Sequence, residues 1–144
     1  MAQSLSASHT AEIKVYYFDT DAGGVVHNIA YLRMVEVART DLAEKLGWTL
    51  AEMGASGIVP VVARTEIDYL KPAKLGDTLR IEGRLTKMEK IRFHLLFEIF
   101  RAADGIKLAA CRQTMVTVNL ASGRPQSVPK AWVEAFPELL GERD

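Results

Sequence analysis

The sequence predicts a single α+β domain in which an antiparallel sheet wraps one long helix. Early in the chain, apolar residues recur every three to four positions, the period of an amphipathic helix; they are Tyr31, Val35, Ala38, Leu42 and Leu46. Later, apolar residues recur every second position in four segments, the period of strands with one buried face. At 144 residues the chain fits one domain, expected over 11–144, that buries roughly two-thirds of its unfolded surface.

The N-terminal part is predicted to pass from a leader to a strand and then to the long helix. Residues 1–10 are small and polar without a period, so we expect a disordered leader there. Residues 11–18 alternate between apolar and polar side chains and indicate a first strand. The helix is expected over 29–46, with Asn28 as its N-cap and Gly47 at its end.

The rest of the chain is predicted to be mostly strand. Residues 48–57 contain glycines at their end and indicate a short helical turn. Four strands are expected from the period of two, at 58–69, 79–85, 91–100 and 106–120. Pro60 places the first of these at a sheet edge or a bulge, because proline lacks the N–H that a central strand donates. A short closing helix is expected over 130–140, where Pro137 kinks or ends it.

Composition excludes several classes of protein. The 18 acidic and 18 basic residues cancel, so no net field attracts nucleic acid or an anionic membrane surface. No apolar run of about 18 residues occurs, so we expect no integral membrane segment. The single cysteine, Cys111, rules out an intrachain disulfide and offers no partner for a cysteine-based metal site. It fits a reducing compartment, so a cytoplasmic protein is expected.

One stretch combines an acidic loop with the start of the long helix. Asp19 and Asp21 stand two apart, and Gly23 and Gly24 permit backbone turns that a side chain would forbid. A carboxylate is thereby held just before a helix N-terminus. Unpaired N–H groups and the helix dipole stabilise negative charge there, including an oxyanion in a transition state, which indicates an acyl-transfer site. In a plainer interpretation, Asp21 only accepts hydrogen bonds from the loop N–H groups of Gly23 or Gly24.

Residues in and after this loop carry a resemblance to a known family. Residues 19–26, Asp-Thr-Asp-Ala-Gly-Gly-Val-Val, are followed by Tyr31-Leu32, Glu36 and Ala38-Arg39-Thr40. This pattern resembles the signature of the 4-hydroxybenzoyl-CoA thioesterase family, particularly its YbgC-like acyl-CoA thioesterases. Residues 66–73, Glu-Ile-Asp-Tyr-Leu-Lys-Pro-Ala, look like the second-strand segment of the same family. The resemblance covers about residues 11–125.

The resemblance implies a hotdog fold, in which a five-stranded antiparallel sheet wraps one long central helix, here with a short C-terminal helix added. It also implies an acyl-CoA substrate, no metal or organic cofactor, and homodimers that share active sites and often join into homotetramers. Asp21 matches the catalytic aspartate of the family, and the backbone amide of Asn28 aligns with the group that receives the thioester oxygen. The family usually has a histidine at the position of Asn28, whereas here the histidine stands one place earlier, as His27.

Several further residues are candidates for binding the acyl part of the substrate. Gly24 and Tyr31 belong to the motif, and His27 is placed to contact or orient the acyl group. Val61 and Val62 lie in a segment that, in a hotdog subunit, approaches the site and lines an acyl tunnel. The same two valines equally suit the core of a strand.

Local cations are the candidates for binding CoA phosphates in a chain of zero net charge. They are Arg64, Lys74 and Arg92, with Lys71 and Lys90 as further possibilities. Charges of this kind are more often a solvated face without a ligand.

The same residues are compatible with two other functions. A hotdog hydratase or dehydratase of 3-hydroxyacyl thioesters needs a histidine base and an acid from a helix, for which His27 and Glu36 are available. Glu36 lies within one turn of Arg33 and Arg39, so a helix ion pair is its simpler role. The other possibility is a non-catalytic subunit that binds an acyl thioester. The sequence does not fix the acyl chain, or whether CoA or an acyl carrier protein carries it.

Overall fold

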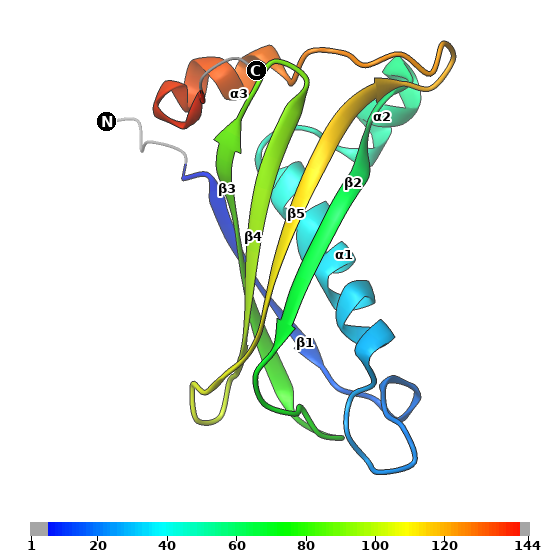
Figure 1. Ribbon diagram of the computed structural model, residues 1–144, viewed down its shortest axis with the longest axis vertical. Coiled ribbons are helices and arrows are strands. Elements are labelled where there is room, and N and C mark those ends of the chain that lie inside the picture. The colour runs from blue at the N-terminus through cyan, green and yellow to red at the C-terminus, as the bar shows by residue number, and fades with distance from the viewer. Residues whose placement is uncertain (1–5, 142–144) are drawn as a thin grey trace.

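The computed structural model describes residues 6–141 and places one long helix against a five-stranded sheet. The elements are β1 (Ser8–Lys14), the 3₁₀ turn η1 (Tyr17–Asp19), α1 (Asn28–Lys45), α2 (Leu50–Ser56), β2 (Ile58–Tyr69), β3 (Thr78–Met88), β4 (Arg92–Arg101), β5 (Lys107–Asn119), α3 (Lys130–Ala135) and the 3₁₀ turn η2 (Pro137–Leu139). The strands are antiparallel in the order β1-β3-β4-β5-β2. α1 runs along the sheet, and α2 and α3 lie at one end of it (Figure 1). This confirms the predicted hotdog arrangement.

α1 is the central helix, and its buried face explains why this segment is helical. The buried residues recur at a spacing of three or four: Ala30, Tyr31, Met34, Val35, Ala38 and Leu42. Burying one side chain of Val, Leu or Met size contributes about 1.5–3 kcal/mol, so packing more than intrinsic propensity holds the helix. The predicted N-cap, Asn28, is wrong by one position. His27 is the cap, because its Nδ1 accepts the N–H of Ala30 at 3.1 Å.

β3, β4 and β5 form the middle of the sheet, and β3 and β4 bury alternate residues in the core. These residues include Leu79, Ile81, Leu85, Phe93, Leu95, Phe97 and Ile99. Gly83 on β3 lies over the ring of Phe97, where a Cβ would stand only 2.7 Å from a ring carbon. The predicted bounds of β4 and β5 agree within one residue with the structure, whereas β3 continues to Met88, past the predicted end at 85.

β2 forms one edge of the sheet and, within residues 6–141, pairs only with β5. Its bounds are those predicted from the sequence, and Pro60 lies on this edge strand as expected. The register shifts between Val62 and Arg64, which marks a bulge. None of its 12 residues is buried. A long edge strand with both faces open pairs readily with another chain.

The predicted leader is too long. Residues 8–10 belong to β1, where Ser8 lies opposite Arg84 on β3. Backbone pairing with β3 needs no apolar side chain, so the polar composition of these residues gave no sign of a strand. Residues 1–5 of the predicted leader lie outside the described residues. The first strand ends at Lys14 instead of residue 18, because the chain turns into η1.

The closing helix is shorter than predicted. α3 ends at Ala135, and Pro137 begins the separate turn η2. Proline cannot donate the backbone hydrogen bond that would continue the helix. No helix in the described part of the chain is both long enough and apolar enough to cross a membrane.

Candidate active site

Asp21 lies in a small hairpin between η1 and α1. Thr20 and Val26 pair across this hairpin, and the N–H of Asp21 donates to the carbonyl of Val25 at 2.9 Å. The side chain of Asp21 is exposed, and its Oδ1 accepts the N–H of Gly23 at 2.8 Å. The loop-cap interpretation is therefore confirmed for Gly23. A carboxylate has about four lone-pair sites, so this bond orients the group without using up its capacity to react.

Asp19 fixes the base of the hairpin from inside the protein. Its side chain is only 1% exposed, and its Oδ1 lies 2.6 Å from Nη2 of Arg33 on α1. Its Oδ2 accepts the N–H of Tyr16 at 2.9 Å, and its carbonyl accepts the N–H of His27 at 3.0 Å. Hydrogen bonds between an arginine and a carboxylate are roughly twice as strong as neutral ones. The hairpin is thereby attached to the central helix.

A second attachment joins the hairpin to the connection between β2 and β3. Val25 forms a bridge with Lys74, and the N–H of Leu75 donates to the carbonyl of Gly24 at 3.2 Å. Gly24 has a φ of 77°, which favours glycine. Gly24 and Lys74, both predicted to bind the substrate, therefore lie on neighbouring segments next to Asp21.

The first amide of α1 has no acceptor among the residues that the structure describes. Asn28 is the first helical residue, so its N–H lies ahead of any intrahelical carbonyl, and no other group among residues 6–141 accepts it. His27 instead caps the N–H of Ala30 through Nδ1. A neutral imidazole has one donor and one acceptor nitrogen, so the proton of His27 is on Nε2. The structure thus makes His27 a helix cap and leaves the Asn28 amide available to an oxyanion.

A cleft of about 330 Å³ opens beside this amide, lined by Val26, Asn28, Tyr31, Tyr69, Leu70, Lys71 and Pro72. The buried hydroxyl of Tyr31 accepts the N–H of Ala73 at 3.1 Å. Tyr69 packs edge-on against Tyr31 with ring centres 5.3 Å apart and donates its hydroxyl to the carbonyl of Asn28 at 3.2 Å. Burial raises the pKa of both tyrosines, so both stay protonated at neutral pH. Asn28 and Tyr31 are the predicted site residues that line this cleft.

Other predicted site residues lie far from the cleft within one chain. Val61, Val62 and Arg64 lie in the first part and middle of β2, whereas Tyr69 is its last residue. At about 3.3 Å per residue, Val61 is roughly 26 Å along the strand from Tyr69. Arg92 lies two strands away from β2 at the level of Val61. A single chain therefore does not bring these four residues to Asp21.

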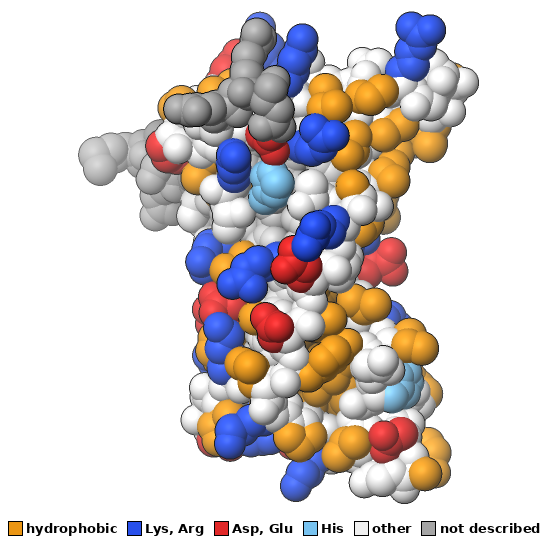
Figure 2. Space-filling view, in the orientation of Figure 1, with side chains coloured by type: hydrophobic (Ala, Val, Ile, Leu, Met, Phe, Trp, Pro, Cys, Tyr) orange, Lys and Arg blue, Asp and Glu red, His pale blue; other side chains and the backbone are white. Residues whose placement is uncertain are grey.

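Charged side chains on the sheet face turned away from the core are mixed in sign. Lys, Arg, Asp and Glu side chains alternate on the visible face in Figure 2. Arg64 pairs with Glu66 at 2.8 Å, and Glu98 pairs with Lys107 at 2.7 Å. This pairing favours a solvated face over a phosphate site at Arg64. Among the cations predicted to meet CoA, Lys71 lines the cleft.

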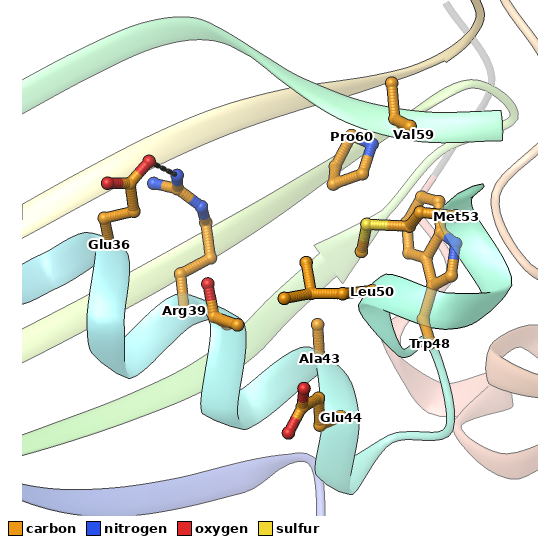
Figure 3. Close-up of a pocket in the computed structure, with 10 residues that line it drawn as sticks. Glu36, Arg39, Ala43, Glu44, Trp48, Leu50, Met53, Val59 and Pro60 are labelled. Carbon is orange, nitrogen blue, oxygen red and sulfur yellow. Dashed lines mark ion pairs between the residues drawn. The ribbon is translucent and has the colours of Figure 1, made fainter. Parts of the chain in front are cut away.

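A separate cavity of about 190 Å³ lies between α1, α2 and β2 (Figure 3). On its α1 side, Glu36 and Arg39 form the predicted helix ion pair at 3.5 Å, and Arg39 also donates to Oε1 of Gln113 at 2.8 Å. Burial lowers the pKa of Arg39, and the nearby Glu36 opposes this effect. Glu36 follows His27 by nine positions, which is roughly 13 Å along a helix. Within one chain, these two residues do not reach the same substrate carbon.

Comparison with known protein families shows to which family the chain belongs. The model of the thioesterase-like superfamily matches residues 17–136, which include the hairpin, α1 and the strands β2 to β5. The chain belongs to the thioesterase-like superfamily. This confirms the resemblance that the motif carries.

Individual relatives of this thioesterase-like chain agree with the family. It is 34% identical over 131 residues to the acyl-CoA thioesterase YbgC of Haemophilus influenzae, covering 88% of this chain and 93% of the relative. It is 30% identical over 126 residues to the acyl-CoA thioester hydrolase YbgC of Escherichia coli O157:H7, with the same coverage of each chain. The crystal structure of Slr0204, a 1,4-dihydroxy-2-naphthoyl-CoA thioesterase from Synechocystis, superposes with a TM-score of 0.81 at 26% identity. That superposition covers 92% of this chain and 97% of the other.

Sequence reasoning missed three residues of the thioesterase-like site. Asp19 and Arg33 are 14 positions apart, and no local spacing rule links them. Tyr69 stands within the second motif segment, 66–73, which was the available signal for it. Their roles depend on how α1, β2 and the hairpin pack together.

The described residues contain neither a cluster arranged to bind a metal ion nor a reactive thiol. Within residues 6–141, no three His, Cys, Asp or Glu side chains are arranged to hold a metal ion. Cys111 is buried on β5, and burial raises the pKa of its thiol to about 11. At neutral pH this thiol is protonated and is a poor nucleophile.

Proposed function

We propose that the chain hydrolyses acyl-CoA thioesters to a carboxylic acid and CoA, with Asp21 as the catalytic carboxylate. One observation carries this proposal. An exposed carboxylate, oriented by Gly23 and held on a hairpin attached to α1, precedes a helix whose first amide, that of Asn28, has no acceptor in the described part of the chain. Membership of the thioesterase-like superfamily and the names of the YbgC relatives support the same reaction and substrate class.

The two groups have separate tasks in this reaction. The amide of Asn28, at the positive end of the α1 dipole, receives the carbonyl oxygen as it becomes an oxyanion. Asp21 either attacks the carbonyl carbon, forming an anhydride that water opens, or takes a proton from the water that attacks. In both routes the C–S bond breaks, the CoA thiolate leaves and gains a proton, and a carboxylic acid forms.

Thiol release from a panel of acyl-CoA esters tests the proposal. Short aliphatic, long aliphatic and aromatic acyl-CoA esters are incubated with the purified protein, and the CoA thiol is measured. The proposal expects catalytic thiol release from at least one class, retained in a Glu36→Gln variant. Saturable binding without thiol release would instead show a non-catalytic subunit. Loss of water from a 3-hydroxyacyl-CoA, abolished by Glu36→Gln, would show a dehydratase.

The oxyanion role of the Asn28 amide has its own test, because Asn28 is the first residue of α1. Proline is favoured at this position, and the preceding residue, His27, already has the extended backbone that proline requires, with φ of −76° and ψ of 156°. Asn28→Pro therefore removes the N–H and preserves the helix, whereas Asn28→Ala keeps the N–H. Loss of one oxyanion donor lowers kcat by about 100 to 1000-fold, so the proline variant alone should lose this activity. Equal kcat values for the two variants would remove the amide from the mechanism.

We also propose that two copies pair through their β2 strands. β2 is a long edge strand, and apolar side chains gather along it (Figure 2), with Val61 43% exposed. Antiparallel pairing of two β2 strands places the start of one beside the end of the other. Val61 and Val62, predicted to line the acyl tunnel, and Arg64, predicted to meet CoA phosphates, then approach the cleft of the other subunit, which their own chain does not allow.

Light scattering coupled to size exclusion tests this pairing. The wild-type chain is expected to have the mass of a dimer or a multiple of it. Val61→Lys puts a charge on the edge and should give a monomer. Thr10→Lys, an exposed position on the opposite edge strand β1, is the matched control and should leave the mass unchanged. A monomeric wild-type protein at assay concentration would contradict the proposal.

Four further predictions accompany this function. An acyl carrier protein is an alternative donor of the acyl group, and the dimers are expected to join into homotetramers. The single cysteine supports a cytoplasmic location. Catalysis by a carboxylate and a backbone amide needs no metal or organic cofactor, so dialysis against a chelator should leave the activity unchanged.

A further inference from the structure

One wall of the cleft at the start of α1 comes from the connection between β2 and β3, residues 70–77, which we call the cleft segment. Leu70, Lys71 and Pro72 of this segment line the cleft. The hairpin before α1 and the turn between β4 and β5 lie at the same end of the molecule (Figure 1). The cleft segment belongs to no helix or strand, so contacts with these neighbours have to fix its position.

Arg101, the last residue of β4, binds the cleft segment through two nitrogens of its guanidinium group. Its Nη2 donates to the carbonyl of Pro72 at 3.1 Å, and its Nε donates to Oδ2 of Asp77 at 3.2 Å. Its third nitrogen, Nη1, donates to Oδ2 of Asp104 at 2.8 Å. A guanidinium group is planar and presents its donors in a fixed geometry, so these bonds hold the cleft segment in one position relative to β4.

The cleft segment in turn contacts α1 and the hairpin. Ala73 is fully buried, its N–H donates to the hydroxyl of Tyr31 on α1 at 3.1 Å, and its carbonyl accepts the N–H of Val26 in the hairpin at 2.8 Å. Oδ2 of Asp77 also accepts the N–H of Lys74 at 2.9 Å, so the carboxylate that the guanidinium binds also shapes this turn. A series of contacts therefore runs from the end of β4 through the cleft segment to the start of α1.

We infer that Arg101 is a positioning residue, which holds the wall of the cleft in place for the acyl-CoA ester without touching the ester itself. Arg101 is not among the residues that line the cleft. The inference rests on the proposed hydrolase function and separates two anchors within it. Asp19 attaches the hairpin of the catalytic carboxylate to α1, so its loss lowers kcat. Arg101 fixes a wall that binds the substrate, so its loss raises KM, because a loose wall has to be ordered when the substrate binds.

Steady-state kinetics of CoA thiol release test this inference with the acyl-CoA ester that the wild type hydrolyses fastest. Arg101→Met keeps an unbranched stem and removes all three hydrogen bonds. Arg101→Lys keeps the positive charge between Asp77 and Asp104 but loses the planar fork. In both variants KM should rise about threefold to tenfold, which corresponds to ordering one side chain on binding, while kcat stays within about twofold of the wild type.

Asp104→Asn is the matched control, because it removes one bond of Arg101 but neither of its bonds to the cleft segment. This variant should keep the wild-type KM. Arg101→Lys also guards against a failure to fold, since it leaves no unpaired carboxylate without a neighbouring cation. A wild-type KM in a folded Arg101→Lys protein would overturn the inference.

Amide hydrogen exchange gives a second readout that does not depend on activity. In Arg101→Lys the N–H of Ala73 should exchange about tenfold faster than in the wild type, while that of Phe97, buried in β4, should be unchanged. Equal acceleration at both amides would show only a general loss of stability and would overturn the inference, as would unchanged exchange at Ala73. No thiol release by the wild type from any ester would instead refute the proposed hydrolase function.

Discussion

Replacing Asp19 by asparagine is expected to destabilise the protein by about 2–3 kcal/mol and to loosen the hairpin that carries Asp21. The carboxylate is 1% exposed and accepts two hydrogen bonds, from Arg33 at 2.6 Å and from Tyr16 at 2.9 Å. An asparagine retains one carbonyl acceptor but turns an NH₂ group toward the second donor. One hydrogen bond to a charged group contributes about 1.5–3 kcal/mol, which sets the scale of the loss.

The exposure of Arg33 keeps the loss below that of a fully buried pair. Breaking such a pair destabilises a protein by about 3–5 kcal/mol, because the remaining charge has no access to water. The Arg33 side chain is 46% exposed, so water screens the charge that Asp19→Asn leaves behind. Loosening the hairpin also displaces Asp21, and a displacement of about 1 Å at a reacting group lowers kcat by about 100-fold.

Urea unfolding of a double-mutant cycle measures this effect. The cycle compares wild type, Asp19→Asn, Arg33→Met and the double variant, and kcat is recorded for each. A coupling energy of about 1–2 kcal/mol is expected for two side chains in direct contact. Coupling near zero would refute the reasoning that this ion pair holds the hairpin. Wild-type kcat in Asp19→Asn would refute its link to catalysis.

Other predictions address the core and the sheet. Gly83→Ala should destabilise by about 1–3 kcal/mol in urea unfolding, because its Cβ would stand 2.7 Å from the Phe97 ring. Gly54→Ala on α2, where a Cβ meets nothing, should instead stabilise by about 0.5–1 kcal/mol. Cys111 should resist a thiol reagent at pH 8 until the protein unfolds, because it is buried and its pKa is about 11. A hydrogen bond from a neighbouring lysine lowers the pKa of Glu98 below its ordinary value of 4.5. The ionised Glu98 therefore stabilises the fold above pH 4.5, and this stability is lost as the pH falls through the lowered pKa of Glu98 in the folded protein. In Glu98→Gln, the free energy of unfolding should fall less steeply with pH in this acid range.

The fold could be predicted from the sequence wherever the spacing of apolar residues shows directly which side chains are buried. The bounds of β2 and the buried face of α1 follow from periods of two and of three to four. The N-cap was missed because His27 and Asn28 are adjacent and both can accept a backbone N–H. The spacing of apolar residues does not distinguish between them. The start of β1 was missed because residues 8–10 are held by backbone pairing with β3.

The candidate site was predictable where its groups come from one contiguous segment. Asp21 and Asn28 belong to a single loop and the helix start that follows it. Their separation in the sequence is short, so the sequence alone places them near each other. Asp19 reaches Arg33 only because the hairpin folds back onto α1. Val61 and Arg92 do not reach Asp21 within one chain, so their predicted role rests on the proposed pairing of two copies, which no single sequence pattern specifies.

The most direct test of the central claim is the rate of CoA thiol release by Asp21→Asn. The substitution keeps the side-chain shape and an acceptor for the Gly23 N–H but removes the reacting carboxylate. Asp104→Asn, an exposed aspartate in the turn between β4 and β5, is the matched control. A loss of kcat of about 1000-fold or more is predicted for Asp21→Asn, with little change for the control. A folded Asp21→Asn protein that releases thiol at the wild-type rate would contradict the account.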